Sequence, residues 1–106
     1  MEIPEPDHQF KVPVVRRPGA YTLYLEQATK HHTFIHCDIH SRWSHAIKAQ
    51  LAQDFAALSA LHGGPFYALH DPVDRKHHKF LRMFGFEWAA SFHDRLQRRM
   101  EIFATH

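Results

Sequence analysis

Apolar and polar positions alternate in two early stretches of this chain. Residues 21–26 (YTLYLE) and 33–40 (TFIHCDIH) both alternate with period two and are rich in residues that favour strands. The residues between them, 27–32, are mostly polar. The pattern predicts a β-hairpin. In its second strand, every other side chain shares one face of the sheet.

After Ser41 the period changes from two to the spacing of a helix. Apolar side chains then recur at steps of four and three, which predicts one stripe along a long amphipathic helix. The stripe consists of Trp43, Ile47, Leu51, Phe55, Leu58 and Leu61. Ser41 or Ser44 is suited to cap the first turn, and Gly63 with Gly64 to end the helix in left-handed backbone.

The pattern in residues 66–105 predicts a short strand, a second helix and a second hairpin. Residues 66–70 (FYALH) are nearly all apolar, as in a strand covered on both faces. Asp74 is suited to cap a helix that ends at Gly85. Residues 87–93 and 98–105 predict two strands joined by a polar turn.

The element order is therefore strand, strand, helix, strand, helix, strand, strand. We expect an α/β (α+β) fold with a mixed, mostly antiparallel sheet of about five strands and two helices. The two strands on either side of the long helix should be parallel, and each hairpin should be antiparallel.

Residues 1–19 show no such periodicity and contain four of the six prolines. We expect an extended N-terminal arm there, followed by a single domain over residues 20–106. Two positions for the arm remain open, across its own sheet or on a neighbouring subunit.

The composition argues against disulfide-rich, membrane-spanning and strongly nucleic-acid-binding proteins. The single cysteine, Cys37, excludes an internal disulfide framework and agrees with a reducing compartment. No apolar run approaches the roughly 20 residues that a membrane-spanning helix needs, so we expect no membrane partner. The formal charge of +2 predicts no strong nucleic-acid footprint, although residues 75–79 and the arginines at 95, 98 and 99 form basic clusters.

The element order and one motif resemble a known family. Residues 80–86 (FLRMFGF) are similar to the Leu-Tyr-x-x-x-Gly-Phe type motif that ends a helix in GCN5-related N-acetyltransferases (GNAT). That family commonly has Asn eleven residues before the motif's glycine, where this chain has Asp74. The likeness covers roughly residues 20–106. Segment 74–85 and Trp43 are also similar to acetyltransferase-like proteins of tailed phages, including internal virion and assembly proteins, which implies the host cytoplasm or a virion.

The resemblance implies an acetyl-CoA site at the start of the long helix, and the chain departs from the family there. Family members approach the cofactor's pyrophosphate with a glycine-containing loop. Here the loop is residues 42–47 (RWSHAI), without glycine. Arg42, Ser44, His45 and Lys48 would still form a weaker anion site, and Asp74 would be a further cofactor-binding residue if acyl-CoA binds.

Two further departures argue against catalysis. Leu81 stands where the family often has the tyrosine that protonates the departing thiolate. The strand and two helices that precede the hairpin in the family, and help bind the acceptor, have no counterpart in 19 residues. We therefore expect no cofactor, or acetyl-CoA if the chain is enzymatic.

Polar residues at the strand ends are the candidates for other chemistry. A base that deprotonates an amine would be Asp38, His40 or His70. His36, Asp38 and His40 share a strand face and are also weak candidates for a divalent metal. Solvated polar side chains explain the same pattern, and we expect no metal.

Aromatic residues are numerous: nine Phe, two Trp and three Tyr. Without the front helices, part of the sheet should be uncovered, which favours self-association or docking, with Trp43, Trp88 and Phe92 as candidate interface residues. The preferred hypothesis is a non-catalytic interaction or structural protein of phage origin, acting in a homo-oligomer or with virion proteins. The alternative is an acyl-CoA-dependent N-acyltransferase with an atypical pyrophosphate loop.

Overall fold

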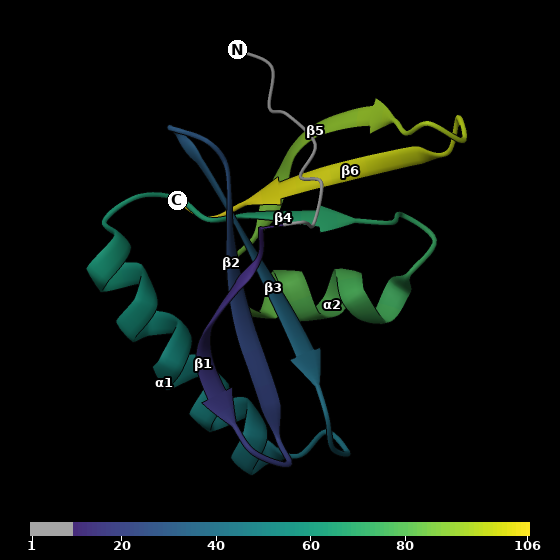
Figure 1. Ribbon diagram of the computed structural model, residues 1–106. Coiled ribbons are helices and arrows are strands. Elements are labelled where there is room, and N and C mark those ends of the chain that lie inside the picture. The colour runs from purple at the N-terminus through teal and green to yellow at the C-terminus, as the bar shows by residue number, and fades with distance from the viewer. Residues whose placement is uncertain (1–9) are drawn as a thin grey trace.

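The structure is a computed structural model that describes residues 10–106. These residues form a mixed six-stranded sheet and two helices (Figure 1). In chain order the elements are β1 (Val12–Arg17), β2 (Tyr21–Thr29), β3 (His32–Ile39), α1 (His45–His62), β4 (Tyr67–His70), α2 (Arg75–Met83), β5 (Glu87–His93) and β6 (Arg99–Ala104). The strand order in the sheet is β1-β2-β3-β4-β6-β5.

The predicted fold class and hairpins are confirmed. The structure is α+β, β2 with β3 and β5 with β6 are antiparallel, and β3 is parallel to β4 across α1. Neither helix of the described chain is long and apolar enough to cross a membrane.

The predicted number of strands was wrong, because the structure has six. The additional strand is β1, which lies inside the predicted arm and pairs antiparallel with β2. Val12, Val14 and Val15 favour a strand, and β1 is at the sheet edge, where Pro13 needs no donor toward solvent. The prolines were therefore poor evidence against a strand. The remainder of the predicted arm, residues 1–9, lies outside the described residues.

The sheet divides between β3 and β4. Within residues 10–106 their ladder contains a single residue pair, Phe34 with Tyr67. Beyond that pair the strands diverge, and in Figure 1 β1, β2 and β3 run across the direction of β4, β5 and β6. The gap opens toward the end of β3 and the start of α2.

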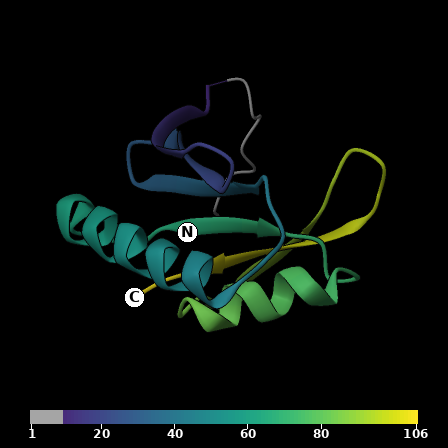
Figure 2. The same ribbon diagram turned by 90° about the horizontal axis from the view of Figure 1, so that it is seen from below.

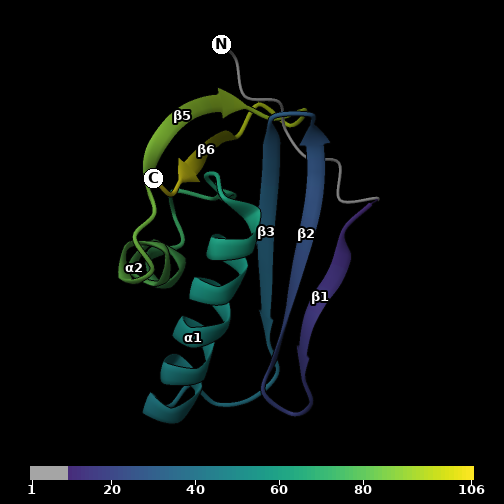
Figure 3. The same cartoon turned by 90° about the vertical axis from the view of Figure 1, so that its left-hand side faces the viewer.

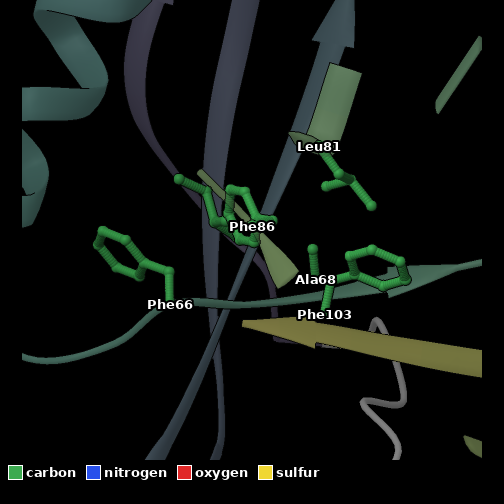
Figure 4. Close-up of a cluster of buried hydrophobic side chains, with 6 residues drawn as sticks. Phe66, Ala68, Leu81, Phe86 and Phe103 are labelled. Atoms are coloured by element: carbon green, nitrogen blue, oxygen red, sulfur yellow. The ribbon is translucent and has the colours of Figure 1, made fainter. Parts of the chain in front are cut away.

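Both helices pack on the same side of β1–β3 (Figures 2 and 3). They cover two clusters of buried side chains, one around Phe66 and Phe103 and one around Tyr21 and Leu23. Figure 4 shows part of the first cluster beside β4. Leu58 of α1 and Phe84, just after α2, pack against both clusters, so the helices connect the two parts of the sheet.

The helix ends confirm the predicted caps. The Ser44 hydroxyl accepts a hydrogen bond from the Ile47 amide at 3.2 Å, and α1 ends at Gly63 with φ 72°. Asp74 caps α2 by accepting from the His77 amide at 3.0 Å. The predicted apolar stripe was too long: Leu61 is 86% exposed, and in the same turn it is His62 that contacts the core, with its ring stacked on Phe66 at a centroid distance of 4.6 Å.

A polar cluster holds α1 against the edge of the sheet. Asp54 of α1 accepts two hydrogen bonds from the Arg17 guanidinium, at 2.7 and 3.0 Å, and one from the buried Tyr21 hydroxyl. The Arg17 hydrogen bond lowers the pKa of Asp54, which burial opposes. Burial, with the hydrogen bond to Asp54, raises the pKa of Tyr21 to about 12.

We predict that Asp54→Ala destabilises the fold by roughly 1–3 kcal/mol, because the buried Tyr21 hydroxyl loses its acceptor. Urea unfolding followed by circular dichroism measures this free energy. Asp38→Ala, at an exposed carboxylate, is the control and should change stability by less than about 0.5 kcal/mol. In the Tyr21→Phe background the cost of Asp54→Ala should shrink; an unchanged cost would show that the two groups are not coupled.

Candidate functional site

A cavity of about 420 Å³ lies where β3 and β4 diverge. Most of its wall is apolar and comes from the two core clusters, with Leu51 and Phe55 on α1 and Phe80 and Leu81 on α2. Its polar lining consists of Lys11, His36, Cys37, Asp38, Lys76 and His77. Apolar pockets with a few polar groups are the usual form of small-molecule sites.

The cavity reaches both faces of the sheet. Side chains alternate along β3, so Ile35 and Cys37 point toward the helices, where they pack in the core, and His36 and Asp38 point the other way. All four line the cavity. A passage between the diverging strands explains why residues of opposite faces share one cavity. Burial raises the pKa of the Cys37 thiol to about 12, so this cysteine stays protonated and unreactive.

Two histidines meet at one wall of the cavity. His70, at the end of β4, is buried, and its Nδ1 lies 2.9 Å from Nδ1 of His77 in the first turn of α2. His77 is half-buried and lines the cavity, whereas His70 lies behind it. Within residues 10–106, the Nε2 atom of His70 is buried without a hydrogen-bond partner.

Burial lowers the pKa of both rings by removing water from the charged form. For His70 the Glu101 carboxylate opposes this effect, and for His77 the adjacent His70 adds to it. Both imidazoles are therefore neutral at pH 7, and the pair is held by a hydrogen bond between neutral rings.

The predicted base candidates do not form one group. Asp38 lines the cavity and is exposed. The His40 Nε2 lies 2.9 Å from the Thr22 hydroxyl, and His40 is not part of the lining. His70 reaches the cavity only through His77.

The candidate metal ligands His36 and His40 each have a different hydrogen-bond partner. His36 pairs with the buried Glu26 at 3.0 Å, and His40 pairs with Thr22. In the described part of the chain, no group of three or more His, Cys, Asp or Glu side chains is arranged to hold a metal ion. His36, Asp38 and His40 therefore form no such group.

Three of the four predicted cofactor residues lie at the start of α1, and the fourth, Asp74, lies at the start of α2. Arg42, Ser44 and His45 are exposed there, but the hydroxyl of Ser44 is engaged as the helix cap. The carboxylate of Asp74 is engaged in the same way at α2. The Trp43 indole packs edge-on against Phe80, with ring centroids 5.8 Å apart, and so fills space between the two helices.

The predicted interface residues lie on different surfaces. Trp88 is 57% exposed, and its indole N–H donates to the Ser91 hydroxyl at 3.0 Å. A bulge between Trp88 and Ala90 shifts the alternation of β5 by one residue, so Trp88 shares a face with Ser91 and Phe92 lies on the opposite face. The sequence pattern missed this, because the bulge depends on pairing with β6.

His77 is the site residue that sequence reasoning missed. In the sequence it stands three residues before Phe80 and four before Leu81, which is the spacing of one helix face. Its contact with His70 spans a loop between β4 and α2, and no spacing rule predicts that two rings will meet across it.

Comparison with known proteins yields no match among family models, curated proteins or solved structures. The GNAT resemblance therefore rests on element order and the motif at the end of α2.

We predict that the stability of the fold decreases as pH falls below about 6.5, the ordinary pKa of histidine. The folded-state pKa values of His70 and His77 are lowered, so the unfolded chain takes up protons first and is stabilised at acid pH. Other charged groups facing the pair are Glu101, Asp71, Asp74 and His78.

The check is urea unfolding at pH 7.5, 6.0 and 5.0 for the wild type and for His77→Phe, which should show a shallower pH dependence. His31→Gln, in the exposed β2–β3 turn, is the control and should keep the wild-type slope. Parallel slopes for wild type and His77→Phe would contradict the assignment.

Proposed function

We propose that this chain is a non-catalytic interaction or structural protein of phage origin with a GNAT-like fold. It acts by self-association or by docking with virion proteins, in the host cytoplasm or in the virion. The observation that carries this proposal is the packing of Trp43 against Phe80 at the start of α1.

That packing opposes cofactor binding for a steric reason. A pyrophosphate needs close approach to the main-chain N–H groups of a first helical turn. Here the Ile47 amide is already bonded to Ser44, and the bulky Trp43 and His45 flank the turn where glycine would leave space. The substitution of Leu81 for tyrosine points in the same direction.

Exposed apolar side chains at the sheet edges support an interaction role. β1 and β5 are the two edge strands, and Val12 and Trp88 are each 57% exposed on them. Both strands contain a bulge, which disfavours pairing of the sheet edge with a strand of another molecule. We therefore place the contact on side-chain surfaces, with Trp88 as the main aromatic.

A second candidate function is favoured by the cavity. An acyl-CoA-dependent N-acyltransferase would need a site for the acyl group beside a base, and Asp38 lines the cavity between β3 and β4. In that case acetyl-CoA would be the cofactor, with Arg42, Ser44 and His45 at its anionic end.

Sedimentation velocity over a range of concentrations tests the proposal. We expect concentration-dependent association of the wild type, and we expect Trp88→Ser to shift the distribution toward monomer, because loss of a buried aromatic anchor costs roughly 2 kcal/mol or more. Leu61→Ser, at an exposed apolar residue on α1, is the matched control. A strict monomer at high concentration would count against self-association.

Calorimetry with acetyl-CoA separates the two candidates. We expect no binding by the wild type at millimolar cofactor and measurable binding by Trp43→Gly, which removes the larger of the two bulky side chains beside the turn. Trp88→Ser should behave as the wild type does. Binding of acetyl-CoA by the wild type at about 1 μM, equivalent to about −8 kcal/mol, would favour the acyltransferase.

A further inference from the structure

We propose that His77 presents a fixed Nε2–H donor to the cavity between β3 and β4, held in this tautomer by His70, and that the cavity binds an apolar carboxylate. This inference goes beyond the proposed function and depends neither on acyl-CoA nor on self-association.

The tautomer follows from the unpaired nitrogen of His70. The two Nδ1 atoms are 2.9 Å apart, so one of them carries a proton and donates it to the other. If His70 accepted, its own proton would be on Nε2, which is buried and has no partner in residues 10–106. If His70 donates, Nε2 is left with only a lone pair.

The second arrangement costs less. Buried N–H groups without an acceptor are rarer in proteins than acceptors that lack a full set of donors. His70 therefore donates from Nδ1, and Nδ1 of His77 accepts. Because His77 is neutral, its single proton must be on Nε2.

The ring of His77 is held where this donor can meet a ligand. His77 lines the cavity from the first turn of α2, and Asp74 fixes that turn by capping its amide. The buried His70 fixes the opposite side of the ring. His77 is a positioned donor, and His70 is the positioning residue that acts through it.

The surrounding wall indicates the class of ligand. Lys76, next to His77, also lines the cavity, so a cation and an N–H donor come from the same helical turn. The adjoining wall is apolar, with Phe80, Phe84 and Phe55. A carboxylate at Lys76 and His77 with an aliphatic or aromatic body along these rings satisfies both regions. Asp38 comes from β3 and would repel an anion there, which places the head group on the α2 side.

The tautomers can be read directly in the wild-type protein. Long-range ¹H–¹⁵N spectra of labelled imidazoles at pH 7.5 should show His70 protonated at Nδ1 and His77 protonated at Nε2. The reverse assignment for either ring would overturn the proposal, and this measurement requires no substitution.

Binding is tested with sodium decanoate as the probe and 1-decanol as its uncharged counterpart. Decanoate should shift the Nε2–H resonance of His77, and decanol should bind at least about tenfold more weakly, since hydrogen bonds to charged groups contribute about 1.5–3 kcal/mol.

Variants assign the effect to His77. His77→Phe keeps an aromatic ring without the donor and should weaken decanoate binding about tenfold or more, whereas His77→Gln keeps a donor and should recover part of the affinity. His93→Phe changes an exposed histidine of β5, which does not line the cavity, and should bind as the wild type does.

Equal affinity of wild type and His77→Phe, or no decanoate binding by the wild type, would refute the carboxylate site. Neither result would bear on sedimentation or on acetyl-CoA binding, so failure of this inference and failure of the proposed function are distinguishable.

Discussion

The parallel pairing between β3 and β4 stops after the register pair of Phe34 with Tyr67, and the rest of the architecture depends on this divergence. Two strands that separate cannot continue to form main-chain hydrogen bonds with each other, and their side chains no longer form one continuous face. The helices therefore have to close two surfaces that point in different directions. Leu58 and Phe84 meet this requirement, because each packs against both core clusters.

The same divergence creates the cavity and determines its chemistry. Alternation along a strand normally separates polar from apolar side chains, but an opening between strands admits both sets. The helix-facing side contributes the aromatic wall, and the other side contributes His36 and Asp38. α2 then adds Lys76 and His77, because its capped first turn lies at the same opening. A polar and an apolar region therefore meet within one small volume.

In the function proposed above, packing at the start of α1 opposes the binding of an anionic cofactor. A first helical turn binds anions only when its amides are accessible. In this chain, Ser44 uses one amide in a cap, and Trp43 turns toward Phe80 to join the two helices. The aromatic contact joins the residue before the α1 cap to α2, with ring centroids 5.8 Å apart.

The sequence alone determined the features that depend on local backbone chemistry and periodicity. Ser44 and Asp74 as caps, Gly63 and Gly85 as helix ends, the two hairpins and the parallel step across α1 all follow from rules that act over a few residues. Only the tertiary structure decided the edge strand β1, the bulge that separates Trp88 from Phe92, and the meeting of His70 with His77. Each of these depends on a partner that is distant in the chain or on a loop whose path no local rule specifies, so its energy exists only after the sheet and helices have assembled.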